Sequence, residues 1–251
     1  MAARSGNPLA PLAVVAAFGA VWWIAARGSV IVPTPWDVVT GTVELARSGL
    51  LLKHIAASLM RVAVGFGLAA ALAIPLGVLM GWFAKVHGAL NPLVQMLRPI
   101  SPIAWIPLAI VWFGVGNLAP IFLIFLASFF PMVVQTAAGI ERVEPEFIRA
   151  GRNYGFRGLR FFRQVVIPAA LPDIVVGVRV ALGVAWLVVV AGEMVAINSG
   201  LGYLIIDARN AGNRYDLVVA GMVAIGVIGF LLDTLTRRLE RMDEVRWRYG
   251  R

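Results

Sequence analysis

The chain offers few residues that could carry out catalysis or hold a metal ion. It contains no cysteine, which excludes disulfides and thiolate metal ligands. His54 and His87 lie far apart and lack acidic neighbours at metal-binding spacing, so we expect both to be ordinary interfacial side chains. No phosphate-binding loop of the form G-x-x-x-x-G-K-[ST] occurs, nor any convincing Ser/His/Asp or paired-carboxylate arrangement. We therefore predict no catalytic residue, no metal site and no ATP hydrolysis by this polypeptide.

Glu193 is a carboxylate in the apolar stretch VVVAGEMVAI. An ionisable group in such a stretch is costly unless it faces protein or water, so a functional role is one interpretation. A structural hydrogen bond to a neighbouring helix is the other. A bare carboxylate would repel an anion, so we expect Glu193 to gate or brace a pathway rather than to bind cargo.

Charged residues also mark the ends of apolar segments. Arg179 could neutralise anions, but we favour its snorkelling to the membrane surface. Asp233 precedes Arg237 by four residues, which predicts an i,i+4 ion pair at an inner helix end.

Composition indicates an integral membrane protein. Hydrophobic residues make up 60% of the 251 residues, charged residues only 14%, and the mean hydropathy is +0.86. Soluble domains average nearer 45–50% apolar residues and about 25% charged residues. The net charge of +9 could suggest nucleic-acid binding. The arginines, however, lie between or after apolar runs rather than among exposed aromatics, which argues against that class.

Six apolar segments are long enough to cross a bilayer, which requires roughly twenty residues each. The first is interpreted as a retained span rather than a removed signal peptide. Between the first two, Pro33 and Pro35 precede an amphipathic stretch that predicts a helix in the outer interface. The predicted spans are Ala10–Ala26, Val62–Phe83, Leu90–Phe113, Leu118–Ile140, Ile174–Ile197 and Leu217–Leu232.

The third predicted span is broken by RPISPIAWIP. Non-helical backbone at membrane depth needs protein or water beside it, so one interpretation is that this break lines a route through the membrane. The alternative is that the glycines and prolines in the spans serve helix packing alone, as in the small-xxx-small pair Gly77 and Gly81. The pathway or gating candidates are Pro99, Ser101, Pro102, Trp105 and Glu193.

The basic residues predict that both termini are inside. With the N-terminus inside, segments 84–89, 141–171 and 233–251 are cytoplasmic and hold thirteen lysines and arginines. Segments 27–56, 114–117 and 198–216 then lie outside and hold five. Cytoplasmic loops carry such an excess of positive residues.

The most basic loop has the pattern of an amphipathic helix. At 100 degrees per residue, Arg152, Arg157, Arg160 and Arg163 fall within about 80 degrees of Arg149. The opposite side gathers Phe147, Ile148, Gly151, Tyr154, Leu159, Phe162 and Val165. Gly155 and Gly158 favour a bend, so two short helices are as consistent as one. A helix lying on the inner leaflet would also fit this pattern.

The same loop resembles the EAA loop of membrane subunits of binding-protein-dependent ABC importers. Its form there is roughly E-A-A-x-x-x-G-x9-I-x-L-P. The matching positions here are Arg149, Ala150, Gly151, Gly155, Val165, Ile167 and Pro168. Arg149 stands where the family commonly has Glu, and Glu146 one turn upstream might substitute for it. Gly151 stands where the family has Ala, a change that is sterically mild.

The resemblance extends over about residues 45–240. LRPISPIAWIPLAIVWFGVGN, IFLASFFPMVVQTAAGI, WLVVVAGEMVAINSGLGYLI and LLDTLTRRLE are similar to the nitrate/sulfonate/taurine/bicarbonate branch of these permeases. The resemblance implies an all-α membrane protein of the type I ABC importer kind, with about six transmembrane helices. Residues 1–251 would form one permease domain, with a cytoplasmic coupling loop at about 141–171.

The resemblance also implies partners. These are a second permease copy as a homodimer, two ABC ATPase subunits that carry ATP and Mg, and an extracytoplasmic solute-binding protein. The protein would be located in a bacterial cytoplasmic (inner) membrane. Its cargo would be a small anion such as nitrate, bicarbonate, taurine or an alkanesulfonate. A stand-alone secondary transporter or channel is the alternative, although it would lack the EAA-like loop. A membrane-embedded enzyme would need converging polar catalytic groups, which we do not find.

Overall fold

The computed structural model describes residues 9–29 and 31–240, and every regular element in these ranges is a helix. The arginines beyond Glu240 that entered the charge argument lie outside the described residues. In chain order the elements are α1 (Leu9–Ala26), α2 (Pro35–Arg47), α3 (Leu50–Trp82), α4 (Ala84–Leu97), the 3-10 helix η1 (Pro102–Trp105), α5 (Ile106–Phe113), α6 (Leu118–Glu141), α7 (Pro145–Asn153), α8 (Gly158–Phe161), the π-helix η2 (Phe162–Val166), α9 (Ile167–Ala196), α10 (Leu201–Asn210) and α11 (Tyr215–Glu240).

Four of the six predicted spans correspond to helices of membrane length, and a fifth corresponds to a bent pair of shorter helices. Four described stretches are long and apolar enough to cross a membrane: α3, α6, α8 through α9, and α11. The broken third span is the pair formed by α4 and η1–α5, bent by 82°. The first predicted span coincides with α1, an apolar helix of 18 residues, close to the lower limit of length for crossing a bilayer. That span therefore stays a prediction.

Three spans begin at least six residues earlier than predicted, and the bent third one starts at Ala84 rather than Leu90. Helix α3 starts at Leu50 rather than Val62, because polar side chains in its first three turns, including Arg61, are buried and hydrogen-bonded instead of lying in a loop. It also continues through Pro75 without a break. Helix α9 starts at Ile167 rather than Ile174 and continues directly from α8 and η2, so that Pro168 lies inside the helical stretch Gly158–Ala196. The π-helical turn η2 comes directly before this proline, and such turns are a common site of irregularity within helices.

The helix predicted between the first two spans is observed as α2, while its location in the outer interface stays a prediction. Its first turn is fixed by a capping box, in which Thr34 and Asp37 satisfy each other's backbone N–H groups. The buried residues of this helix are Val38, Gly41 and Leu45, while Trp36 is 67% exposed. Its apolar residues therefore face both the bundle and the surroundings.

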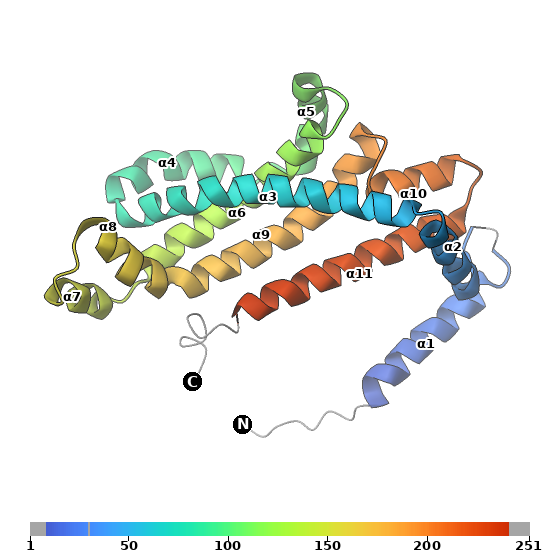
Figure 1. The fold of residues 1–251 in the computed structure, drawn as a ribbon, viewed down its shortest axis with the longest axis horizontal. Coiled ribbons are helices and arrows are strands. Elements are labelled where there is room, and N and C mark those ends of the chain that lie inside the picture. The colour runs from blue at the N-terminus through green and yellow to red at the C-terminus, as the bar shows by residue number, and fades with distance from the viewer. Residues whose placement is uncertain (1–8, 30, 241–251) are drawn as a thin grey trace.

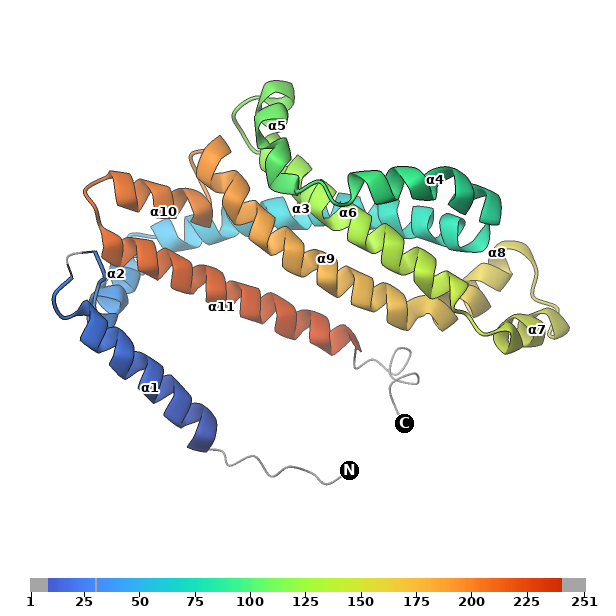
Figure 2. The ribbon, with the colours of Figure 1, turned by 180° about the vertical axis from the view of Figure 1, so that it is seen from behind.

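Helices α3, α6 and α9 form the centre of the bundle, and α3 and α9 both pack on α6 (Figures 1 and 2). Glycine lets α3 approach α6 closely. A Cβ on Gly77 would lie 2.5 Å from the Cβ of Thr136, and one on Gly81 would lie 2.5 Å from the carbonyl oxygen of Ala137. This is the small-residue packing predicted for this pair.

The two ends of the bundle carry different elements. Helices α7 and α8 lie at one end, whereas α2 and α10 lie at the other; both views show α1 diverging from the bundle (Figures 1 and 2). Segments predicted to be outside meet at the α2–α10 end, as in the ion pair of Arg214 with Glu44. Segments predicted to be cytoplasmic meet at the other end, where His87 Nδ1 lies 2.8 Å from Glu141 Oε1. The two ends are called outer and inner below.

Candidate functional site

The basic loop forms a bent element at the inner end, here called the elbow (residues 145–168). Pro145 starts α7, and the chain turns after Asn153 into α8, so the two-helix form is the one observed. Gly155 and Gly158 have φ of +80° and +56°, in the left-handed region where a side chain is strained. The turn therefore depends on glycine at both positions.

One face of the elbow packs against the bundle. Ile148, Phe156 and Val165 lie on a buried cluster around Phe161 and Val166. Gly151 is buried in this contact, and a Cβ there would lie 2.8 Å from Val165 and 3.0 Å from Phe161. The expectation that glycine in place of the family's alanine is sterically mild is therefore wrong, because alanine would require these neighbours to shift.

The other face of the elbow is exposed and basic. Arg149 forms an ion pair with Glu146 on the surface of α7, with side chains 70% and 66% exposed. Arg160 donates to Gln164 Oε1 (3.1 Å) and lies over the ring of Phe156. The remaining arginines of the loop, Arg142, Arg152, Arg157 and Arg163, are exposed as well.

The bend also exposes two large side chains that the single-helix pattern placed on the apolar face. Tyr154 is 82% exposed and Leu159 83% exposed. Beside Tyr154, a groove of about 440 Å³ runs between α7 and the start of α9, lined by Phe147, Ala150, Gly151, Tyr154, Phe156, Gln164, Val165, Pro168 and Ala169. Of the predicted coupling residues, Ala150, Gly151, Val165 and Pro168 line this groove. Each of the other three, Arg149, Gly155 and Ile167, is next in sequence to a residue that lines it. The elbow thus offers cations around an apolar recess.

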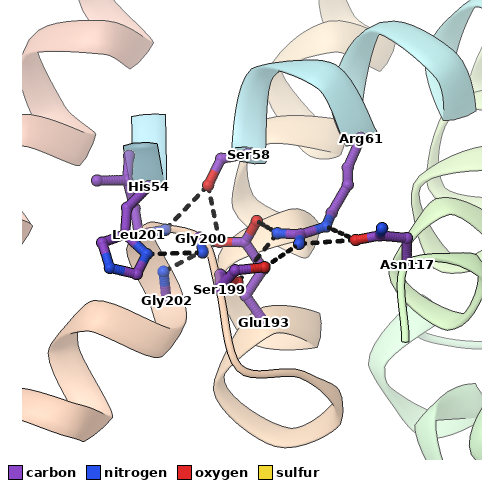
Figure 3. Close-up of polar contacts among 9 residues, drawn as sticks. All are labelled: His54, Ser58, Arg61, Asn117, Glu193, Ser199, Gly200, Leu201 and Gly202. Atoms are coloured by element: carbon purple, nitrogen blue, oxygen red, sulfur yellow. Dashed lines mark hydrogen bonds and ion pairs between the residues drawn. The ribbon is translucent and has the colours of Figure 1, made fainter. Parts of the chain in front are cut away.

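A second polar cluster lies at the outer end, here called the outer clamp (Ser58, Arg61, Asn117, Glu193, Ser199 and Gly202; Figure 3). Its centre is an ion pair of 2.6 Å between Arg61 Nη1 of α3 and Glu193 Oε1 of α9. The two side chains are 2% and 0% exposed. Glu193 therefore makes the hydrogen bond to a neighbouring helix that one of the two sequence interpretations required.

The clamp satisfies both charged groups completely. Arg61 donates two hydrogen bonds to Asn117 Oδ1 (2.9 and 2.8 Å), one to the carbonyl oxygen of Ser199 (3.0 Å) and one to its hydroxyl. The second carboxylate oxygen of Glu193 accepts from the Ser58 hydroxyl (2.8 Å) and the backbone N–H of Gly202 (3.0 Å). All five N–H groups of the guanidinium thus have acceptors.

His54 belongs to the same region. It is 6% exposed, and its Nδ1 accepts the backbone N–H of Gly200 at 3.0 Å. Ser58 Oγ likewise accepts the N–H of Leu201 at 2.9 Å. The expectation that His54 is merely interfacial is therefore wrong, since it is buried and holds the turn between α9 and α10.

The break in the third span is separate from the clamp. Pro99 and Ser101 are exposed, Pro102 and Trp105 are half-buried, and Trp105 packs near Trp112 and Phe122. The described hydrogen bonds of Glu193 go to Ser58, Arg61 and Gly202, and none goes to the break. The structure thus groups the predicted pathway residues into two sets.

Sequence reasoning missed Arg61, Ser58 and Asn117. His54, Ser58 and Arg61 recur at spacings of four and three, which places them on one helix face. Extending the second predicted span toward the N-terminus would have shown this polar stripe. Asn117 and Ser199 carry no comparable signal.

Two smaller predictions can be compared with the structure. Arg179 pairs with Asp233 Oδ1 of α11 at 3.1 Å while 31% exposed, so it is held by an ion pair as it nears the surface. Asp233 Oδ2 also lies 2.7 Å from Arg237 Nε, which confirms the predicted i,i+4 pair. Among the described residues, no group of three His, Cys, Asp or Glu side chains could hold a metal ion.

The fold and the elbow together define a multi-pass helical membrane protein with a folded inner loop, and comparison with known proteins identifies its family. The model of the family "binding-protein-dependent transport system inner membrane component" matches residues 73–242. The chain therefore belongs to this family of ABC importer permeases.

Curated relatives narrow the group. The chain is 36% identical to a putative aliphatic sulfonates transport permease of Bacillus subtilis, over 96% of this chain and 86% of that protein. It is 36% identical to the taurine transport system permease of Escherichia coli K12 (88% and 83% covered). It is 35% identical to the nitrate import permease of Leptolyngbya laminosa (84% and 76% covered). It is thus a membrane permease of an ABC importer in the nitrate/sulfonate/taurine group.

A solved structure supports the fold. An inward-facing structure of the MetNI methionine ABC transporter matches with a TM-score of 0.69 at 20% identity, covering 78% of this chain and 97% of that one. The protein is accordingly a multi-pass protein of the bacterial inner-membrane type. It is a non-catalytic subunit without a cofactor of its own, and its family implies separate ATPase subunits, which bind ATP, and a solute-binding protein.

Proposed function

We propose that this permease is driven by two ATPase subunits that dock on the elbow, and that it carries a small oxyanion or organosulfonate as a homodimer. Residues 1–251 act as one transmembrane domain in this proposal. Arg149, Ala150, Gly151, Gly155, Val165, Ile167 and Pro168 form the coupling region. The exposure of the elbow is the observation that carries the proposal.

The contacts of the elbow suit transmission of force between subunits. The side of the elbow that faces the bundle is fixed through Phe161 and Val166, so a displacement of α7 would be passed through η2 to α9. On the side facing away from the bundle, Tyr154 and Leu159 are almost fully exposed, and Tyr154 borders the apolar groove. Large exposed apolar side chains of this kind mark protein interaction sites.

The inner-leaflet alternative is less consistent with this geometry. A helix lying on lipid would present its apolar face to the bilayer and its arginines to phosphate groups. Here a large part of the apolar face of the elbow, including the buried Gly151, is already packed against its own bundle. The stand-alone carrier alternative is not retained, because the family works with separate ATPases.

Removal of the elbow tests the coupling. Deleting residues 149–158 should abolish co-purification with the ATPase. Leu159→Ala is a milder variant that costs little folding energy, because Leu159 is 83% exposed. It should weaken ATPase binding about tenfold, equivalent to about 1.4 kcal/mol. Leu52→Ala, 72% exposed at the outer end, is the matched control and should bind normally. Undiminished ATPase binding by the deletion variant would refute this docking site.

The cargo requires a separate experiment on the partner solute-binding protein. The relatives named for sulfonates, taurine and nitrate suggest the class, and in such systems the binding protein does much of the selecting. A thermal-shift screen with nitrate, bicarbonate, taurine and alkanesulfonates should show stabilisation by at least one of them. If none of the four stabilises the binding protein, the proposed cargo class is wrong, whatever the outcome at the elbow.

A further inference from the structure

The outer clamp places a buried ion pair inside membrane-length helices, where it needs an explanation other than stability. An ion pair out of water gains little over a pair of well-packed apolar side chains, because both charges must first be desolvated. Buried polar groups can instead specify one arrangement of the elements that carry them. The question is therefore which elements this pair arranges.

The clamp joins three parts of the chain that are far apart in sequence. Arg61 of α3 reaches Asn117, which precedes α6, and Ser199, which lies in the turn between α9 and α10. Glu193 returns from α9 to Ser58 of α3 and to the first turn of α10. Figure 3 shows the guanidinium lying between Asn117 on one side and the carboxylate with the turn on the other.

The hydrogen bonds leave the clamp no spare partner. Every N–H of Arg61 is engaged and both oxygens of Glu193 accept, so separation of any one segment would leave a buried group unsatisfied. Such a group pays its full desolvation cost. A latch that opens in every cycle would need water or a second set of partners at this point.

The turn between α9 and α10 packs tightly against the carboxylate of Glu193. Gly200 has φ +103°, and a Cβ there would lie 2.2 Å from the carboxyl carbon of Glu193. A Cβ on Gly202 would lie 2.2 Å from the carbonyl oxygen of Val190. The backbone of the turn thus lies in close contact with Glu193 and with α9.

We propose that the outer clamp stays closed throughout the transport cycle, so that α3, the start of α6 and the α9–α10 turn move as one rigid body. Arg61 and Glu193 are positioning residues in this assignment. They set where α10 and the α5–α6 connection lie at the outer end, and the opening that admits cargo occurs between this body and other parts of the transporter. The proposal needs only the ATP-driven cycle of the family and is independent of the cargo.

Distance measurement across the clamp tests its rigidity. Because the chain lacks cysteine, Val115→Cys and Asn198→Cys can be introduced and spin-labelled without removing native thiols. Both positions are exposed, and they lie two residues and one residue from Asn117 and Ser199. In the complete transporter with its ATPase, the distance distribution should be the same without nucleotide and after trapping with ATP and vanadate. A shifted distribution on trapping would overturn the proposal, because the clamp would then open.

A double substitution separates positioning from stability. Arg61→Met with Glu193→Met removes both charges at once and so avoids an unpaired buried charge. We expect this variant to fold, to broaden the spin-label distribution and to transport at least about tenfold more slowly. The matched control, Glu44→Met with Arg214→Met, removes an exposed pair at the same end and should change transport less than about twofold.

Each outcome of this experiment bears on the proposal. Wild-type transport by the Arg61→Met/Glu193→Met variant would show that the pair only stabilises the fold, which contradicts the positioning role. If that variant fails to fold, the spin-label comparison in the protein with an intact clamp still decides whether the three segments move together.

Discussion

The two ends of the bundle use arginine in opposite ways. At the inner end, Arg149 is 70% exposed and pairs with a neighbour on its own helix. At the outer end, Arg61 is 2% exposed and pairs with a carboxylate 132 residues away. A surface pair of the first kind is screened by water and salt, whereas the second is fixed by its surroundings.

The difference shows why charge alone did not reveal both sites. The elbow gathers its arginines in one loop, so its charge is visible in the sequence and available to a partner. The clamp holds a single arginine whose importance comes from burial and from acceptors brought together by folding. The experiments below contrast the two ends, in order of decreasing expected effect.

Truncation of a clamp residue should have the largest effect. Arg61→Ala leaves Glu193 buried without its counterion, and we expect the free energy of unfolding to fall by about 3–5 kcal/mol. Arg214→Ala is the control at the same end. The pKa of Arg214 is raised chiefly by its hydrogen bonds to Asp216 and, next, to Glu44. Arg214 stays charged but is 43% exposed, so its loss should cost at most about 1 kcal/mol. Thermal unfolding in detergent measures both, and equal losses would contradict the contrast.

Substitution of glycines that have a positive φ should give the next largest difference in stability between the two ends. Gly200→Ala forces both a left-handed alanine and a methyl group against the carboxylate of Glu193, and we expect a loss of about 3 kcal/mol. Gly155→Ala in the elbow forces only the backbone, because nothing lies within 4 Å of its Cβ position, and should cost about 1–2 kcal/mol. The same unfolding measurement applies. A larger loss at Gly155 would show that the turn between α9 and α10 can relax.

The elbow was largely predictable from sequence because its signals are local. The arginine spacing predicted an amphipathic element, and Gly155 with Gly158 indicated the bend that the structure shows. The bend then changed which side chains are exposed, as at Tyr154, because a single helical wheel cannot describe two helices. The local sequence pattern therefore predicted that the elbow is helical and bent, but not which of its side chains are exposed.

The clamp was only half predictable. Glu193 was conspicuous because it interrupts an apolar run, but Arg61 was placed outside the second span, since hydropathy alone sets a boundary where polar residues begin. The stripe of His54, Ser58 and Arg61 could have corrected this boundary. Asn117 and Ser199 could not have been found, because they lie 56 and 138 residues from Arg61 and only the tertiary fold brings them together.

Crowding at Gly151 should have a smaller effect that is specific to the elbow. Gly151→Ala places a methyl group 2.8 Å from Val165, which should lower the free energy of unfolding by about 1–2 kcal/mol. Gly88→Ala is the matched helical control at the inner end, with open space around its Cβ position. It should be neutral or stabilising by up to about 1 kcal/mol, since alanine favours helix. If both substitutions behave alike, the close contact between α7 and η2 is not required.

The surface pair of α7 should show the smallest effect. A double-mutant cycle with Glu146→Gln and Arg149→Gln isolates the coupling between the two side chains from their other contacts. Because both are mostly exposed, we expect a coupling free energy of about 0.2–1 kcal/mol at low salt. It should vanish in 1 M salt, where the screening length is about 3 Å. The cycle is read by thermal unfolding of the permease alone. A coupling above about 1 kcal/mol that survives high salt would place this pair in the same physical class as Arg61 and Glu193, and the contrast between the two ends would fail.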